Sequence, residues 1–318
     1  MRRTKLRRTK PLKTIEFVVN VLYLRKEEAA MNVKRTALAT ALGLLLVAPA
    51  SAGAETLIGS GSTAAQPYLQ ALFQGYKKVQ PSIQFLYTGD GGNSGVKDVQ
   101  AGRSEFAGQS RAPLPSDAGT TYIQEFADGL CIDVNPKNNL TNISATDLAN
   151  IFLGTETNWA QVVGSGLSTT IDAYGRNSTA GTFTFFTSAI LNNGIQGSNV
   201  TTEASDGLVA NAVKNDANGI GYIGLAYQGA GLKSIKVNGL ACDDANVKAQ
   251  TYPLSRFIWL VVPATNPNPD VLAFANWVRT SAAAGVIINQ VGGVPVTNAA
   301  PPVAKPKPKP KPKKKKKK

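Results

Sequence analysis

A strand that runs through a glycine- and hydroxyl-rich loop into a helix occurs twice between residues 56 and 99. The loop 59–63, Gly-Ser-Gly-Ser-Thr, follows a short apolar strand, and apolar residues then recur at helical spacing over 69–76. The loop 89–95, Gly-Asp-Gly-Gly-Asn-Ser-Gly, follows the apolar segment 83–87 in the same way. This alternation predicts a parallel α/β fold, in which ligands bind at the carboxyl ends of the strands.

A third loop, 176–182, combines an arginine with three hydroxyl groups and a glycine where a helix is expected to begin. It reads Arg-Asn-Ser-Thr-Ala-Gly-Thr and follows the apolar strand 170–174. Free N–H groups and the helix dipole attract anions at helix N-termini, and a guanidinium can grip two oxygens at once. The loop therefore predicts an oxyanion half-site, with an ordinary helix cap beside a surface arginine as the alternative.

The chain contains no histidine and only two cysteines, Cys131 and Cys242. Catalytic triads built on histidine and histidine-based zinc sites are therefore excluded, and two cysteines so far apart do not form a metal-binding pair. We expect no enzyme, no metal and no cofactor. An exported phosphate-ester enzyme with a hydroxyl nucleophile remains as an alternative class.

The formal net charge of +14 is concentrated at the two ends of the chain. Residues 1–52 contain 11 basic and 3 acidic residues, and residues 304–318 contain ten lysines and no acid. The segment 53–303 contains 13 basic and 17 acidic residues, so its net charge is −4. No nucleic-acid partner is expected for this segment.

Residues 31–52 have the pattern of a secretory signal peptide, within an expected over-extended start at 1–52 whose true first residue is Met31. A basic start is followed by the apolar segment 36–47 and by Ala-Ser-Ala at the expected cleavage site. The apolar segment is too short for an ordinary membrane span, and no cysteine lies near the cleavage site. We expect an exported protein of the periplasm or cell surface that loses its signal peptide and is not a lipoprotein.

The tail 301–318 consists of Pro-Pro-Val-Ala, four Lys-Pro pairs and six lysines. Alternating proline favours an extended, disordered arm with free charges. We expect this arm to hold the protein to an anionic cell-wall polymer or lipid. The alternative is a solubilising appendage.

Five separated motifs, in consistent order over residues 55–297, resemble the phosphate-binding proteins of bacterial phosphate ABC importers. Two of them are the Gly/Ser loops, the second of which continues into Val-Lys. The others are similar to the family's Phe-Gly-x-Ser-Asp-Ala-Pro-Leu, Arg-x-x-x-Ser-Gly-Thr and Tyr-Pro-Leu-x-Arg motifs, and lie at 106–114, 176–182 and 252–256. The resemblance implies an extracytoplasmic protein that captures phosphate and delivers it to an ABC transporter permease in the membrane.

The fold implied by this resemblance is the type II periplasmic-binding-protein fold, in which two α/β lobes close around a ligand. Two hinge strands would cross between the lobes, near 129–134 and 251–258. Lobe one would then comprise 55–130 and 257–300, and lobe two 131–256.

The resemblance also implies a phosphate site formed by several loops. Its expected members are Ser62, Thr63, Gly92, Asn93, Ser94, Arg111, Arg176, Ala180, Gly181 and Thr182. Ala180 stands where the family has a serine, so one hydroxyl is missing, and Ser178 or Thr179 is the expected replacement.

Arg111 stands where the family has the acid that accepts the proton of phosphate and repels sulfate. We expect one of two outcomes. Asp90, which is otherwise a turn residue, supplies the acceptor and keeps the specificity for phosphate, or the site is a more positive trap that also binds sulfate-like oxyanions. Arg111 itself is expected either at the anion or in a salt bridge at the cleft rim.

Two further questions stay open at the level of sequence. Disulfides persist in exported proteins, so Cys131 and Cys242 are expected either to form a bond or to remain as two buried thiols. The remaining alternative function is a surface adhesion or sensor module that reuses the fold. In that case the lysine tail would make the functional contact.

Overall fold

The computed structural model describes residues 54–229 and 231–296, all of which belong to one compact unit. The predicted signal peptide at 31–52 and the lysine-rich tail at 301–318 lie outside the described residues, so both stay predictions.

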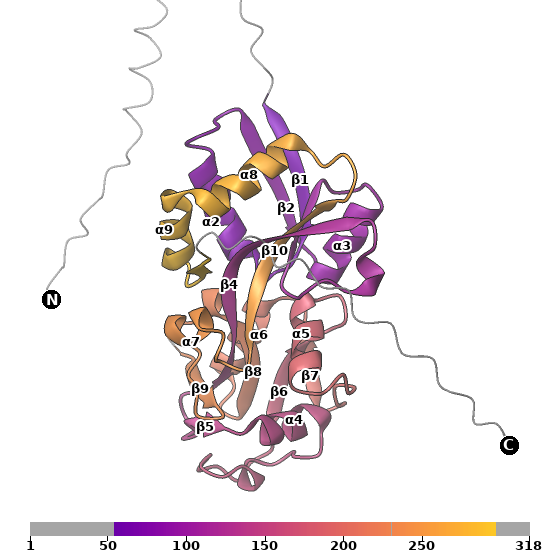
Figure 1. Ribbon diagram of the computed structural model, residues 1–318. Coiled ribbons are helices and arrows are strands. Elements are labelled where there is room, and N and C mark those ends of the chain that lie inside the picture. The colour runs from indigo at the N-terminus through magenta and orange to yellow at the C-terminus, as the bar shows by residue number, and fades with distance from the viewer. Residues whose placement is uncertain (1–53, 230, 297–318) are drawn as a thin grey trace, which may run out of the picture. The chain divides into compact units, whose positions relative to one another are not determined.

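The first lobe is built on three parallel strands, with β1 between β2 and β3. Strand β10 lies antiparallel on the other side of β3, and helices pack against this part of the sheet (Figure 1). The elements are β1 (Glu55–Gly61), α2 (Gln66–Tyr76), β2 (Ile83–Gly89), α3 (Gly92–Gln100), β3 (Phe106–Gln109), β10 (Ser255–Pro263), α8 (Pro269–Thr280), α9 (Ala282–Gln290) and β11 (Val294–Pro295).

The second lobe is built on β6, which pairs in parallel with β7 and β8. The short strands β5 and β9 pair with each other in parallel, and residues 233–235 of β9 pair with residues 132–134. The elements are β5 (Asn142–Ile143), α4 (Ala145–Leu153), β6 (Asp172–Arg176), α5 (Gly181–Ala189), β7 (Val200–Glu203), α6 (Asp206–Asn215), β8 (Gly219–Gly224), β9 (Lys233–Val237) and α7 (Asp244–Lys248).

Strand β4 (Thr120–Val134) belongs to both lobes. Its residues 120–129 pair with β10, and its residues 130–134 pair with β8. The two long strands β4 and β10 therefore lie side by side where the lobes meet (Figure 1). Arg256 on β10 lies directly opposite Asp128 on β4, and the two form a buried ion pair at 2.8 Å.

Each lobe has its own hydrophobic core. In the first, the predicted face of α2, with Leu69, Leu72, Phe73 and Tyr76, is buried against the sheet and α8, which confirms the helix expected from its periodicity. Phe73 stacks on Phe85 with ring centroids 4.1 Å apart. Removing such a buried ring typically costs about 3–5 kcal/mol, so this core fixes the position of the loop that precedes α2.

The second core is centred on Trp159, Phe186 and Tyr222, with Phe186 stacked on Tyr222 at 4.1 Å. Cys131 on β4 and Cys242 form a disulfide within this lobe. Helix α4 ends at Leu153, where Gly154 adopts the left-handed conformation that commonly terminates a helix.

Among the described residues, no single helix is long and apolar enough to cross a membrane. The pair α8 and α9 reaches that length and composition together, with a bend of 77° between them.

Candidate anion-binding site

Three of the eight described α-helices, α2, α3 and α5, begin without a side-chain cap. The other five are each capped by a serine, an aspartate or an asparagine. Helix α2 begins shortly after the predicted loop 59–63, and helices α3 and α5 begin within the predicted loops 89–95 and 176–182. Because the first N–H groups of a helix need acceptors, these starts are suited to bind an anion.

Asp206, at the start of α6, joins residues from these loops. Its Oδ2 accepts a hydrogen bond from Oγ1 of Thr63 at 2.7 Å, and its Oδ1 accepts one from Oγ1 of Thr182 at 3.3 Å. The guanidinium of Arg176 forms an ion pair with the same carboxylate and donates to Oγ1 of Thr63 at 2.7 Å. All four side chains are at most 2% exposed, and Thr63 comes from the other lobe, so this cluster lies between the lobes.

Hydrogen bonds fix both the backbone and the guanidinium of Arg176. Its N–H donates to the hydroxyl of Tyr222 at 2.6 Å, and its Nε and Nη2 donate to the carbonyls of Glu203 and Ala204, each at 3.0 Å. These contacts leave Nη1 as the nitrogen that faces Thr63 and Asp206. A guanidinium fixed in this way is preorganised to bind an oxygen at that point.

A second arginine reaches Thr182 from the hinge. Nη1 of Arg256 donates to Oγ1 of Thr182 at 3.1 Å, while its Nε donates to Asp128 at 2.8 Å. Burial raises the pKa of Asp128, and the ion pair with Arg256 opposes that shift. Oγ of Ser110 lies 3.4 Å from Oγ1 of Thr182, which adds a further hydroxyl from the first lobe.

Gln109 fills the space between the starts of α3 and α5. A Cβ atom added to Gly92 would lie 2.2 Å from Oε1 of Gln109, and one added to Gly181 would lie 1.8 Å from it. The same oxygen accepts a hydrogen bond from the N–H of Ser110 at 2.8 Å. Both positions therefore require glycine while this fully buried amide keeps its place.

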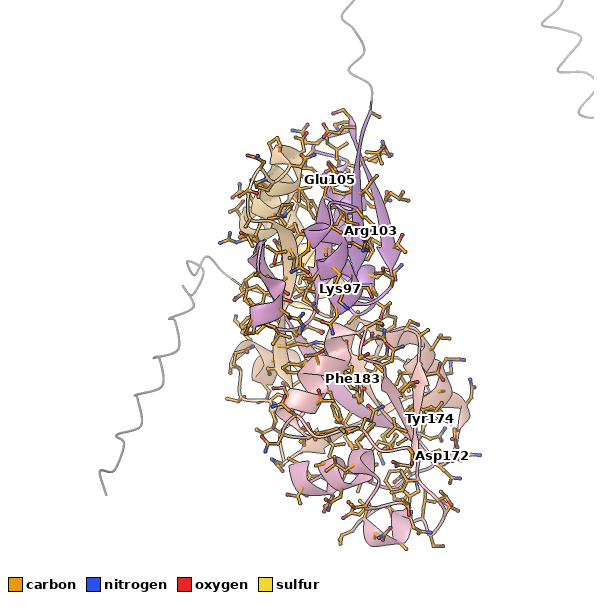
Figure 2. The ribbon with its side chains drawn as sticks, turned by 90° about the vertical axis from the view of Figure 1, so that its right-hand side faces the viewer. Lys97, Arg103, Glu105, Asp172, Tyr174 and Phe183 are labelled. Atoms are coloured by element: carbon orange, nitrogen blue, oxygen red, sulfur yellow. A yellow bond between two sulfur atoms is a disulfide. The ribbon has the colours of Figure 1, made fainter. Side chains whose placement is uncertain are left out.

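Asn93 connects the second predicted loop to the third. Its N–H donates to the carbonyl of Thr179 at 2.9 Å, and its Nδ2 donates to the carbonyl of Ser178 at 2.9 Å and to Oγ1 of Thr184 at 2.8 Å. The helices α3 and α5, marked by Lys97 and Phe183, meet at the boundary between the lobes (Figure 2). Asn93 thus acts as a contact between the lobes rather than as a side chain with free donors.

Arg111 is placed in a salt bridge rather than in the cluster around Asp206. Its Nη1 and Nη2 contact the two carboxylate oxygens of Asp117 at 2.7 and 3.0 Å, and its Nε donates to Asn93 at 2.7 Å. The guanidinium keeps the pKa of Asp117 below its ordinary value, although burial acts in the opposite direction. The positive charge of Arg111 is therefore balanced locally.

Other candidates from the sequence lie at the margin of the cluster. Asp90 is exposed, and so are Ser178 and Thr179, whose hydroxyls make no hydrogen bond to the cluster. Oγ of Ser62 accepts from the N–H of Ala65 at 3.3 Å. Ser94 is half-buried in the first turn of α3, and Ala180 is buried directly before α5.

Three residues of this region were absent from the candidates chosen by sequence. They are Gln109, Asp206 and Arg256. Arg256 is the last residue of the Tyr-Pro-Leu-x-Arg motif at 252–256. Asp206 follows Ser205 at a visible helix start after a strand, which was the available signal for it.

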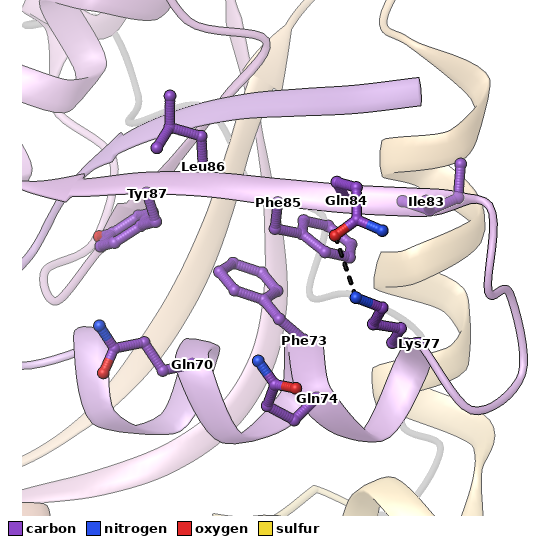
Figure 3. A pocket seen from close by; sticks show the side chains of 9 residues that line it. All are labelled: Gln70, Phe73, Gln74, Lys77, Ile83, Gln84, Phe85, Leu86 and Tyr87. Atoms are coloured by element: carbon purple, nitrogen blue, oxygen red, sulfur yellow. Dashed lines mark hydrogen bonds between the residues drawn. The ribbon is translucent and has the colours of Figure 1, made fainter. Parts of the chain in front are cut away.

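A surface groove on the first lobe differs in chemistry from this cluster. It has a volume of about 270 Å³ and lies between α2 and β2, with Phe73, Phe85 and three glutamines facing it (Figure 3). Its single cation, Lys77, donates to Gln84 at 3.1 Å. It lacks the arginines and helix starts that favour an anion. In the described part of the chain, no group of three or more acidic, cysteine or histidine side chains could hold a metal ion.

These features define the class of protein, namely a two-lobed α/β binding protein with polar groups from both lobes in contact where the lobes meet. Residues 46–281 match the family model of the PBP superfamily domain. The chain therefore belongs to the PBP superfamily.

Named relatives and solved structures agree with this family. Protein SphX of Synechococcus elongatus is 29% identical over 282 residues, covering 81% of this chain and 82% of SphX. Phosphate-binding protein PstS of Pseudomonas aeruginosa is 24% identical over 212 residues, covering 59% of this chain and 66% of PstS.

A protein from Clostridium perfringens, solved with bound phosphate, superposes on this chain with a TM-score of 0.72 at 22% sequence identity. The superposition covers 76% of this chain and 100% of the Clostridium perfringens chain. An ABC-type phosphate transport receptor from Vibrio cholerae gives a TM-score of 0.63 at 24% identity, covering 76% of this chain and 99% of that one. The predicted type II fold is confirmed.

Proposed function

We propose that this chain is the extracytoplasmic phosphate-binding component of an ABC importer. The observation that carries the proposal is the convergence of uncapped helix starts and the Arg176–Asp206 cluster between two lobes. The names of its relatives and the bound phosphate of a structural neighbour support the same ligand. We also propose that it hands phosphate to a membrane permease, which the description of a structural neighbour as an ABC-type phosphate transport receptor supports.

The residues proposed to contact phosphate are of two kinds. The donors are the hydroxyls of Ser62, Thr63, Ser94 and Thr182, the guanidinium of Arg176, and backbone N–H groups at Gly92 and at the start of α5, after Ala180. Asn93 is proposed to hold the closed lobes together instead, because its N–H donates to the carbonyl of Thr179. Asp206 is the acceptor. Arg256 positions Thr182, and Arg111 positions Asn93.

Asp206 gives the site a physical reason to prefer phosphate to sulfate. An entering anion meets the carboxylate that already accepts from Thr63, Thr182 and Arg176. A hydrogen phosphate ion can donate its remaining proton to that carboxylate, whereas fully ionised sulfate places oxygen against oxygen. A buried acceptor left without a donor costs about 1–3 kcal/mol, and more when it is charged. Asp206 therefore takes the acceptor role that one of the two expected outcomes assigned to Asp90.

Capture requires the two lobes to move. We propose that lobe one, 55–130 and 257–300, and lobe two, 131–256, open about the strands β4 and β10. Thr63 would then separate from Arg176 and Asp206, and phosphate would enter between them. Closure would restore contacts such as the one between Asn93 and Thr179.

Calorimetric titration of the chain from Gly53 onward, first with phosphate and then with sulfate, tests this function. We expect phosphate to bind at least tenfold more tightly than sulfate. Equal affinities would overturn the role of Asp206 and leave a general oxyanion-binding protein. No binding of either anion would overturn the proposed function and favour the adhesion or sensor module. Release of product from a chromogenic phosphate ester would contradict the proposal that the protein is not an enzyme.

Export and surface retention are separate parts of the proposal. We propose that the signal peptide at 31–52 is removed during export, which N-terminal sequencing of the mature protein would test. We also propose that the tail 301–318 contacts an anionic wall polymer or lipid. Unchanged cell-surface retention after removal of this tail would rule that contact out.

A further inference from the structure

Glu125 is a buried acid outside the anion site, and neither of its carboxylate oxygens has a hydrogen-bond partner among the described residues. Glu125 as a whole is only 2% exposed. It lies on β4 at a β-bulge, where β10 pairs with Gln124 and Phe126 and skips the residue between them. Burial raises the pKa of this carboxyl well above its ordinary value, and the charge of Arg279 opposes that shift only in part. An ionised group in this position requires a cationic partner.

Glu125 is one of the residues that line a pocket of about 240 Å³ between the bulge, the end of α8 and the start of α9. Most of its wall is apolar, and two hydroxyls and one guanidinium are its other polar groups. The lining residues are Glu125, Val278, Arg279, Thr280, Ser281, Ala282, Gly285, Ile288, Pro295 and Val296.

We propose that this pocket binds a primary alkylammonium group, with Glu125 as its counter-ion. An ammonium offers three donors to the two carboxylate oxygens, and a methylene stem matches the apolar wall formed by Ile288 and Val296. A divalent metal does not fit as well, because Glu125 is the only carboxylate among the described lining residues and such ions take several oxygen ligands. Arg279 is half-buried, and its positive charge favours a ligand with a single ammonium over a more highly charged one.

The ammonium has two possible sources, a lysine of this chain or a free amine. The described chain ends at Val296, which itself lines the pocket. The first lysine beyond it is Lys305, and nine extended residues span up to about 30 Å. A lysine of the tail can therefore return to the pocket, and its attachment would give it a high effective concentration there. A free alkylamine has the same chemistry without this advantage.

The experiment compares the full chain with a full-length variant in which all ten lysines of residues 305–318 are glutamine. Each protein is titrated calorimetrically with n-pentylamine and, separately, with 1-pentanol at pH 8.5. If the tail is the source, pentylamine binds the glutamine-tail variant at least tenfold more tightly than the full chain. If free amines are the ligands, it binds both proteins equally.

Glu125→Gln in the glutamine-tail background is expected to weaken pentylamine binding at least tenfold. Asp244→Asn, which neutralises an exposed acid on α7, is the matched control and should change nothing. Gly285→Val fills the pocket without altering the carboxylate and should also abolish binding. Phosphate titration checks that each variant is folded. Three results would overturn the proposal. Pentylamine would not bind the glutamine-tail variant, or pentanol would bind it as tightly as pentylamine does. In the third, pentylamine would bind the Glu125→Gln and Gly285→Val variants as tightly as their parent protein.

Discussion

Oγ1 of Thr63 donates to Oδ2 of Asp206 at 2.7 Å, although the two residues are 143 positions apart and belong to different lobes. This hydrogen bond places a loop of the first lobe against a helix start of the second. It also fixes the one acidic group that the cluster with Arg176 and Thr182 presents to an anion. The selectivity of the site is therefore expected to depend on Asp206.

Replacing Asp206 with asparagine should reduce the discrimination between phosphate and sulfate. The amide keeps an acceptor of the same shape but adds donors, so phosphate loses its charged acceptor and sulfate loses a repulsive neighbour. We expect the affinity ratio to fall about 10- to 100-fold, which corresponds to roughly 1.4–2.8 kcal/mol. Calorimetric titration with both anions measures the ratio, and Asp90→Asn is the control because Asp90 is exposed. An unchanged ratio in Asp206→Asn would assign the selectivity to another group.

Replacing Arg176 with lysine should weaken phosphate binding although the charge is retained. Lysine cannot donate to Glu203, Ala204 and Thr63 in the geometry of a guanidinium. We expect a loss of about 2–4 kcal/mol in binding free energy, and a larger loss for alanine. The matched control is Arg103→Ala, since the salt bridge of Arg103 with Asp98 is largely exposed and contributes little. Titrations that give the same affinity for the lysine variant and the unaltered protein would contradict the role of Arg176.

Gly181→Ala should disturb the start of α5 through Gln109. The added methyl would overlap Oε1 of Gln109, which is fixed by the N–H of Ser110. We expect weaker phosphate binding in Gly181→Ala and partial recovery in the double variant with Gln109→Ala. A coupling free energy of about 1 kcal/mol or more between the two changes is the measurable sign. Gly229→Ala, where nothing lies within 4 Å of the added methyl, serves as the control. If the free-energy changes of the two substitutions simply add, Gln109 is not the reason that position 181 requires glycine.

The sequence was sufficient to predict the fold, and it marked the three loops from which α2, α3 and α5 begin, because both depend on local patterns and on the order of motifs. The loops before α2, α3 and α5 could be recognised from their glycines and hydroxyls and from the apolar helices behind them. Asp206 could not be assigned by this route, since its role arises from its contact with Thr63, which belongs to the other lobe. For Arg111, its partner Asp117 is close in sequence, but only the fold shows that Tyr122 and Asn93 complete its surroundings.

Loss of the disulfide between Cys131 and Cys242 should destabilise the protein without changing its affinity for phosphate. The bond closes a loop across 111 positions, and a loop of this length restricts the unfolded chain by up to about 4–5 kcal/mol. We expect the double variant Cys131→Ala and Cys242→Ala to unfold at a lower urea concentration. Calorimetry under the same conditions should give an unchanged phosphate affinity, since neither cysteine contacts the cluster around Asp206. Identical unfolding midpoints would show that the bond does not contribute to stability.

Asp133 should make the stability of the second lobe depend on pH. Burial raises its pKa to about 7 from an ordinary value of 3.8, and its hydrogen bond from Gln228 opposes this shift. Between these two values the folded state binds more protons than the unfolded state, so the contribution of Asp133 to stability falls as the pH rises from about 4 to 7. Asp133→Asn removes that penalty, which is on the order of 4 kcal/mol above pH 7. We therefore expect the variant to be more stable than the unaltered protein at pH 8 and not at pH 4. Urea unfolding at both pH values tests this, and an equal difference at pH 4 and pH 8 would show that the carboxyl group does not titrate in this range.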